Sequence, residues 1–130
     1  MIIGTLTNAG ERKIRQYIHV NPDHDLYIGW GFCSTSDTAA VTDSRLVNEY
    51  GRAVATVTPS AGTLTVAISE LIDKGYSIME VGIFDAASGG SMLYRGLLSE
   101  DSSTPKSRHL EDGDTLSVSI ALHFAAGEFI

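Results

Sequence analysis

Apolar residues recur at every second position along most of the chain after residue 25, the period of β-strands that bury one face. The last run, "DTLSVSIALHF" (114–124), alternates most regularly. This pattern predicts a strand whose polar residues, among them Thr115, Ser117, Ser119 and His123, face outward. The residues expected to face the core are Leu116, Val118, Ile120, Leu122 and Phe124.

Two other regions have the pattern of antiparallel hairpins. "RAVATVTPSAGTLTVAIS" (52–69) contains a "PSAG" turn at 59–62, followed by Leu64, Val66 and Ile68 on one face. "SIMEVGIFD" (77–85) and "SMLYRGLLS" (91–99) flank the small-residue turn "AASGG" (86–90). In this second hairpin, we expect Val81 and Ile83 to face the core. Its glycines are expected to serve a turn with unusual backbone angles.

The remaining stretches are less regular. "DLYIGWGFCS" (25–34) predicts a strand with one buried face, and two glycines, Tyr27 and Cys33 lie on its other side. The residues expected on the buried face are Leu26, Ile28, Trp30 and Phe32. Residues 41–49 are compatible with either a helical turn or an extended run. Residues 99–114, "SEDSSTPKSRHLEDGD", are polar enough to predict a long surface loop.

Only the beginning of the chain has a helical pattern. Asn8 followed by Glu11 is a possible capping box, and Ile14, Tyr17 and Ile18 form an apolar stripe. We therefore expect one short helix over about residues 9–19, ended by Pro22. Strands at this spacing, with turn residues between them, are typical of a β-sandwich or small barrel. The sequence predicts one domain (1–130), a mainly β, antiparallel β-sandwich of about six or more strands with one short N-terminal helix.

Composition and charge narrow the classes of partner. The chain has 130 residues, 43% of them apolar, and its net charge is -7 with no strong cluster of Lys and Arg. Such a surface repels a phosphate backbone, so we expect no nucleic-acid partner. No apolar run approaches the length of a membrane span, and the first residues lack the charge order of a signal peptide. With its lone cysteine, Cys33, the chain is expected to be assembled in a reducing cytoplasm, without membrane insertion.

The motifs of catalysis are weak. Ser88 lacks the G-x-S-x-G order of a nucleophile elbow and sits where a turn residue is expected. "DHD" (23–25) offers metal ligands, but adjacent residues of an extended chain point to opposite sides. The four histidines are scattered. We therefore expect no enzyme activity, no cofactor and no metal site.

The apolar ends of the sequence leave two alternatives open. Met1, Ile2, Ile3, Phe129 and Ile130 lie near the termini. Terminal residues often fray unless they are tied down, and exposed apolar patches are uncommon on soluble monomers. These residues are expected either to pack on their own domain or to serve as arms that enter a neighbouring subunit.

Several segments, taken in order, carry a resemblance to a known family. They are "LTNAGERKI", "YIGWG", "LVNEYGR", "SIMEVGIFDAASGGSML" and "GDTLSVSIALHF", and together they extend over about residues 5–124. In this order the chain resembles the tail-fibre and tail-collar type N-terminal domains of tailed bacteriophages. Each segment alone is a weak signal, and the ordered series is the stronger one.

The resemblance implies a non-enzymatic structural virion protein in the tail, baseplate or collar, assembled in the host cytoplasm. Its partners would be other virion proteins and further copies of itself, and one role would be to anchor a fibre. Family members that are tail fibres continue into a shaft and a receptor-binding tip, so the resemblance supports attachment more than receptor recognition. The residues expected at interfaces lie in the termini, the loop 100–113 and the turn: Met1, Ile2, Ile3, Ser88, Gly89, Pro105, Arg108, Phe129 and Ile130.

Two alternatives remain open. The first is a head-decoration or head-fibre protein, which would use similar surfaces. The second is a carbohydrate-binding or hydrolytic module acting on the host envelope, for which the available aromatic residues are Trp30, Tyr27, Tyr76 and Tyr94. Hydrolysis would need two carboxylates across a cleft, and the sequence identifies no such pair.

Overall fold

The computed structural model describes residues 2–7, 25–33, 43, 45–60, 63–99 and 106–123. The helix predicted over residues 9–19 and the inward position of Phe124 lie outside these residues. The described part contains no helix, and therefore no helix that is long and apolar enough to cross a membrane. The strands are β1 (Ile2–Leu6), β2 (Tyr27–Gly31), β3 (Glu49–Val54), β4 (Thr56–Ser60), β5 (Thr63–Leu71), β6 (Tyr76–Ile78), β7 (Glu80–Phe84), β8 (Met92–Leu98), β9 (Arg108–Leu110) and β10 (Thr115–His123).

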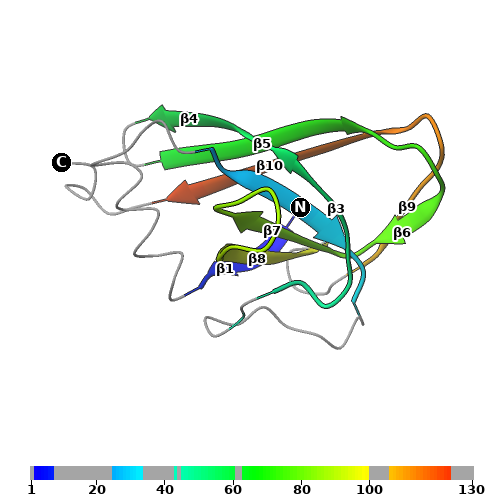
Figure 1. Ribbon diagram of the computed structural model, residues 1–130, viewed down its shortest axis with the longest axis horizontal. Coiled ribbons are helices and arrows are strands. Elements are labelled where there is room, and N and C mark those ends of the chain that lie inside the picture. The colour runs from blue at the N-terminus through cyan, green and yellow to red at the C-terminus, as the bar shows by residue number, and fades with distance from the viewer. Residues whose placement is uncertain are drawn as a thin grey trace.

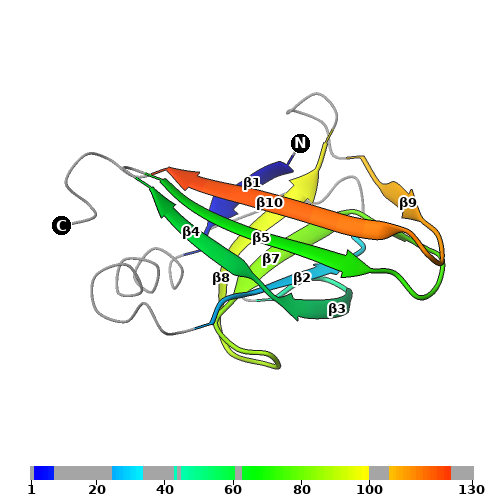
Figure 2. The ribbon, with the colours of Figure 1, turned by 90° about the horizontal axis from the view of Figure 1, so that it is seen from above.

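These strands form antiparallel sheets. A five-stranded sheet has the order β1-β8-β7-β2-β3, a three-stranded sheet the order β10-β5-β4, and β6 pairs with β9. Figure 1 shows the three-stranded sheet above the five-stranded one, and Figure 2 shows its strands crossing over those beneath. The mainly β, antiparallel part of the prediction is therefore confirmed.

One stretch of chain joins the two sheets along one side. Only Ala55 separates β3 from β4, and its backbone N–H donates to the Leu26 carbonyl oxygen over 2.7 Å. β3 is an edge strand of the five-stranded sheet, and β4 is an edge strand of the three-stranded sheet. The opposite edges are β1 and β10, which belong to different sheets and are far apart in sequence.

The core lies between the two sheets. The alternation predicted for β5, β7 and β10 is confirmed, because every second side chain of these strands is buried in one apolar cluster. The inward residues of these three strands are Leu64, Val66, Ile68, Val81, Ile83, Leu116, Val118, Ile120 and Leu122. Burial of such alternating faces supplies the main stabilisation of the fold.

Both predicted hairpins are present. β4 and β5 pair up to Pro59 opposite Leu64 and Ser60 opposite Thr63, the first two residues of the predicted "PSAG" turn lying in β4. β7 and β8 pair around the 85–91 turn, in which Gly89 and Gly90 have φ values of 64° and 70°. L-residues with a side chain rarely adopt this left-handed region, so glycine is favoured at both positions.

Phe32 departs from its predicted position on a buried face. β2 ends at Gly31, and its pairing with β3 shifts register between Trp30 and Gly31. Such an irregularity breaks the alternation of side chains. Phe32 is consequently 37% exposed, whereas Leu26, Ile28 and Trp30 are buried as expected.

The polar segment 99–114 is not only a loop. Its residues 108–110 form β9, which pairs with β6 and buries Leu110 in the core. The irregular segment 41–49 is described at residue 43 and from residue 45 onward, where bends at 45, 47 and 48 precede β3. The described part of that segment contains no helical turn, and its bends lead into β3 at Glu49.

Candidate functional site

The structure places the predicted interface residues in separate regions. Ser88 and Gly89 are exposed in the turn that follows β7, whereas Arg108 is exposed at the start of β9, beyond the other end of β7. The backbones of Ile2 and Ile3 lie in β1, paired with β8. The other residues expected at interfaces, Met1, Pro105, Phe129 and Ile130, lie outside the described residues. The described candidates thus belong to three regions rather than one site.

The turn that contains Ser88 is held by an arginine from β3, an arrangement we call the Arg52 clamp. Arg52 Nη1 donates to the carbonyl oxygens of Ala86 and Gly89, over 2.8 and 2.9 Å. Its Nε and Nη2 donate to the two carboxylate oxygens of Glu49, each over 2.8 Å. Its guanidinium carbon also lies 3.5 Å from the centroid of the Phe84 ring. A bidentate, stacked arginine has little freedom, so the turn is fixed in place.

Small residues make room for the Arg52 clamp. β2 lies between β3 and β7, so Arg52 must reach across it to the turn. Its pairing partner on β2 is Gly29. A Cβ at Gly29 would lie 2.9 Å from the Phe84 ring and 3.1 Å from a Glu49 carboxylate oxygen. The absent side chain at Gly29 therefore allows Arg52, Glu49 and Phe84 to meet above the sheet.

The turn has a further internal constraint. The Ser91 N–H donates to Asp85 Oδ1 over 2.7 Å, and the Asp85 N–H donates to the Ser91 carbonyl oxygen over 3.2 Å. A Cβ at Gly90 would lie 2.5 Å from Asp85 Oδ1 and 2.7 Å from the Ala86 Cβ, whereas a Cβ at Gly89 would meet nothing within 4 Å. Gly90 is therefore required both because a side chain would overlap its neighbours and because its φ is positive. At Gly89, the positive φ is the only requirement.

A buried ion pair lies on the same face of the five-stranded sheet. Glu80 is fully buried, and its carboxylate accepts hydrogen bonds from the backbone N–H groups of Val47 and Asn48. Arg95 is 3% exposed, with Nη2 3.5 Å from Glu80 Oε1 and Nη1 3.3 Å from Asp43 Oδ2. We call these residues the Glu80–Arg95 pair. It fixes the segment before β3 against the sheet.

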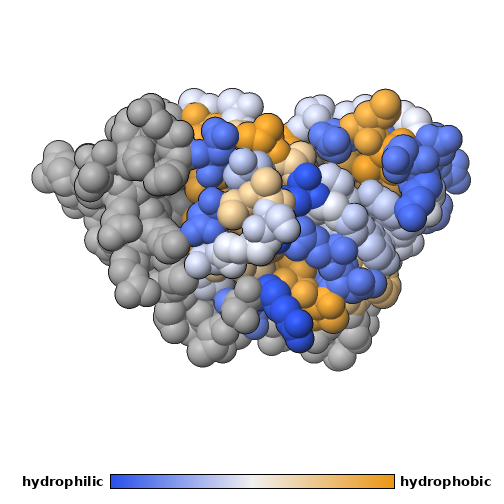
Figure 3. Space-filling view, in the orientation of Figure 1, coloured by the Kyte–Doolittle hydropathy of each residue, from blue (hydrophilic) through white to orange (hydrophobic). Residues whose placement is uncertain are grey.

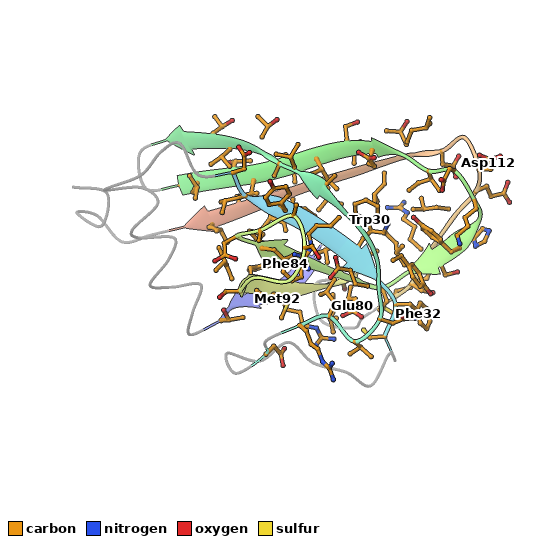
Figure 4. The ribbon with its side chains drawn as sticks, in the orientation of Figure 1. Trp30, Phe32, Glu80, Phe84, Met92 and Asp112 are labelled. Atoms are coloured by element: carbon orange, nitrogen blue, oxygen red, sulfur yellow. The ribbon has the colours of Figure 1, made fainter. Side chains whose placement is uncertain are left out.

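Apolar contacts continue along this face. Leu46 packs with Phe84 and Met92, and a Cβ at Gly82 would lie within 3.2 Å of atoms from all three side chains. Figure 4 shows Phe84 and Met92 next to each other, with Glu80 farther along the same sheet toward Phe32. The face of the five-stranded sheet that points away from the other sheet is thus covered by the chain leading into β3. Cys33 is buried nearby with Met79 and Leu97.

Among the described aromatic residues, Tyr50 and Tyr76 form a stacked pair that is partly exposed. Trp30 and Tyr94 are buried, as core packing predicts, so they offer no surface platform. Tyr50 is 41% exposed and packs against Tyr76 with ring centroids 4.8 Å apart, and Trp30 Nε1 donates to the Tyr76 hydroxyl over 2.8 Å. The two tyrosines, with Lys74 and Gly75, line a depression of about 300 Å³. Sequence analysis had not included Tyr50 in such a platform.

A groove opens on the other side of the molecule, between β10 and β8. It has a volume of about 310 Å³ and includes Tyr94, Leu98 and Arg108 beside residues 116–121 of β10. Burial raises the pKa of Tyr94 from the ordinary value of 10 to about 12, because ionisation would place a charge where water is scarce. Arg108 is the predicted interface residue that borders this groove.

The described residues contain no group of three or more His, Cys, Asp or Glu side chains that could hold a metal ion. Asp23 and His24 of the "DHD" segment lie outside them. The front face of the molecule, which includes β3 and the turn, mixes hydrophilic and hydrophobic residues (Figure 3).

Comparison with known families finds no family model that matches the sequence, and comparison with curated proteins finds no match.

Sequence analysis missed the Glu80–Arg95 pair and the contacts of Arg52. The available signal for Glu80 was a single carboxylate inside the otherwise apolar run "SIMEVGIF". A charge in that position is rarely fully buried unless it is paired. For Arg52, the signal was a carboxylate three residues earlier, at Glu49, and that distance alone does not identify the turn as the other partner.

Proposed function

We propose that this chain is a non-enzymatic structural virion protein of a tailed phage, a β-sandwich module located in the tail, baseplate or collar. In this proposal it docks to neighbouring virion proteins and works by binding, without turnover. Anchoring a fibre is one form that such docking would take.

The observation that carries the proposal is the Arg52 clamp. Three segments of the family resemblance, "YIGWG", "LVNEYGR" and "SIMEVGIFDAASGGSML", contribute Gly29, Glu49 with Arg52, and the turn, respectively. β3, β2 and β7 are neighbours in one sheet, and the clamp joins the three segments into one structural unit. The proposal takes this unit, with its ordered and exposed turn, as the docking element.

The geometry of the turn suits a docking role. Ser88 and Gly89 are exposed, while the backbone on either side of them is held by Arg52 and Asp85. A loop that is already ordered loses little conformational entropy when a partner binds. Repeated copies in a particle would add avidity to modest individual contacts. These features favour a binding surface over a catalytic one.

The direct test is the composition of purified particles. Mass spectrometry of virions from the phage that encodes this chain should detect it as a stoichiometric component, and immunogold labelling should place it on the tail. Its absence from mature particles would overturn the proposal. Labelling of the capsid would instead support the head-decoration alternative.

A matched pair of variants tests whether the turn does the docking. Arg52→Ala removes the clamp, and Arg45→Ala removes an exposed arginine from the same region. In a phage complemented with each variant, we expect Arg52→Ala to reduce incorporation and Arg45→Ala to leave it unchanged. Circular dichroism of both purified proteins checks that they fold. Equal incorporation of two folded variants would exclude the turn as the docking surface.

The depression beside Tyr50 favours a second candidate function, carbohydrate binding. Sugars stack on exposed aromatic faces, and Tyr50, Tyr76 and Lys74 provide such a face with a cationic neighbour. Glycan-array binding that is lost in Tyr50→Ala and retained in Phe32→Ala, another exposed aromatic residue, would support it. Absence of binding to host envelope glycans would exclude it.

A further inference from the structure

In the described part of the chain, β10 is a nine-residue edge strand of the three-stranded sheet. Among the described residues, only β5 pairs with it, along nine consecutive residues without a register shift. Its sequence, "TLSVSIALH", contains no Asp, Glu, Lys, Arg or Pro. Such a strand presents unpaired backbone N–H and C=O groups to any extended chain that can lie beside it.

The other edges each have a feature that hinders pairing. β3 includes the charged residues Glu49 and Arg52, and its pairing with β2 shifts register. β4 contains Pro59, which has no N–H to donate, and β1 is only five residues long. Charges, prolines, bulges and short length are the devices by which proteins protect sheet edges. β10 has none of them.

The groove described above runs along the same strand. It lies between β10 and β8, and its apolar lining includes Leu98 and Tyr94 from β8 and Ile78 from β6. The groove therefore opens on the apolar core beside this edge strand. A strand added to β10 would lie over this opening.

The alternation of inward apolar and outward residues in β10 is symmetric about Ser119. In an antiparallel pair with two-fold symmetry at Ser119, both copies place apolar residues on the same face of the joined sheet. The opposed pairs would be Leu116 with Leu122, Val118 with Ile120, Ser117 with Ala121, and Thr115 with His123. If the pairing of the two copies were shifted by one residue, the core-facing side chains of one copy would lie opposite the solvent-facing side chains of the other.

We propose that β10 is a homodimer interface, in which it pairs antiparallel with β10 of a second copy around Ser119. The three-stranded sheets of the two copies would then join into one continuous sheet, β4-β5-β10-β10-β5-β4. A second copy is the occupant that this strand fits, because its apolar and polar positions are symmetric about Ser119 and its nine residues include no Asp, Glu, Lys or Arg that would face its own copy. The contact is isologous, so it closes at two subunits.

This interface does not depend on the proposed function. A protein of any class could form it, and its failure would leave the virion proposal untouched. Virion composition tests that proposal, whereas self-association of the purified chain tests this one.

A charge-pair experiment tests both the partner and the register. At the two-fold axis residue 119 faces its own copy, so Ser119→Lys and Ser119→Glu each place like charges opposite each other. In sedimentation velocity we expect each variant to dimerise at least about tenfold more weakly than wild type, because like-charge contacts are unfavourable. An equimolar mixture of the two should recover the dimer, since Lys then faces Glu.

Ser69→Lys is the matched control. Ser69 is exposed on β5, directly opposite Ser117, so this change adds the same charge to the same sheet away from the edge. It should leave the dimer unchanged, and circular dichroism checks the fold of each variant. A monomeric wild-type protein, or Ser119 variants that dimerise as wild type does, would overturn the proposal. Failure of the mixture to recover the dimer would overturn the register.

Cross-linking gives an independent readout. Directly opposed residues of antiparallel strands have Cα atoms about 4.5–5.5 Å apart, within the range that a disulfide spans. Ser119→Cys should form an intermolecular disulfide on mild oxidation, and Ser69→Cys should not. The native Cys33 is buried, and the wild-type protein controls for its contribution. Equal cross-linking of both variants would contradict pairing at Ser119.

Discussion

The two sides of this molecule differ in their content of charged residues. The side formed by β2, β3 and the turn uses Glu80, Arg95, Arg52 and Glu49 in internal contacts, with several of these groups buried or nearly so. β10, on the other side, has no Asp, Glu, Lys or Arg on its nine residues. Charges that are satisfied internally fix local structure, whereas an uncharged edge leaves the backbone open to a partner. Changes to the charged groups of the first side should therefore lower stability, and changes at the edge of β10 should alter self-association.

The largest effect is expected at Glu80. Replacing it with Ala leaves Arg95 buried without this carboxylate and removes the acceptor for the Val47 and Asn48 N–H groups. Breaking a buried pair from one side costs about 3–5 kcal/mol of unfolding free energy. Urea denaturation measures this loss.

The control for Glu80→Ala is Glu111→Ala, at an exposed carboxylate. It should change the unfolding free energy by less than about 0.5 kcal/mol. Equal stability of the two variants would mean that the Glu80–Arg95 pair does not stabilise the fold.

Alanine variants of the two glycines of the turn distinguish the free-energy cost of steric overlap from that of a left-handed backbone conformation. Gly89→Ala should cost about 1–2 kcal/mol, the cost of a left-handed conformation for a residue with a side chain. Gly90→Ala should cost at least about 1 kcal/mol more, because its Cβ would overlap Asp85 and Ala86. Chemical denaturation of both variants gives the difference. Identical losses would show that Asp85 moves aside without cost.

Arg52→Lys tests the clamp while keeping its positive charge. A lysine lacks the forked donors that reach Glu49 and the turn carbonyls together, so we expect a loss of about 1–2 kcal/mol. Amide hydrogen exchange in residues 86–90 should also accelerate. Arg45→Lys, at an exposed arginine, is the control and should change neither quantity. Unchanged exchange in Arg52→Lys would exclude the clamp as the restraint on the turn.

The effect that is smallest at neutral pH concerns Tyr94, beside the groove on the β10 side. Its pKa is about 12 in the folded protein and about 10 in the unfolded chain. Its contribution to stability is therefore complete below pH 10 and is lost as the pH rises toward 12, because the unfolded chain ionises first. The unfolding free energy of Tyr94→Phe should decline less steeply over this interval. Identical pH dependence in the two proteins would contradict the burial of this hydroxyl.

The alternation of apolar residues was sufficient to predict much of the fold. It identified both hairpins and the inward residues of β5, β7 and β10, because every second side chain of a strand points to the same face of its sheet. It failed at Phe32, where a register shift ends the period. It also missed β9, whose three residues include only one apolar anchor, Leu110.

The candidate site was less predictable than the strands. The position of Glu80 in β7 gives it an outward direction, which by alternation alone predicts contact with solvent. It is buried because the chain before β3 covers that face of the sheet, a contact between residues more than 30 positions apart. The reach of Arg52 across β2 depends likewise on tertiary packing. The free edge of β10 became visible only once the strand order was known.

The contrast between the two sides can be measured in one experiment, hydrogen–deuterium exchange of the wild-type protein at low and at high concentration. Pairing of β10 with a second copy predicts that amides of residues 115–123 gain protection as the concentration rises, while those of residues 49–54 in β3 do not. Exchange at β10 that is independent of concentration, or protection gained at β3 instead, would contradict the assignment of β10 as the interface.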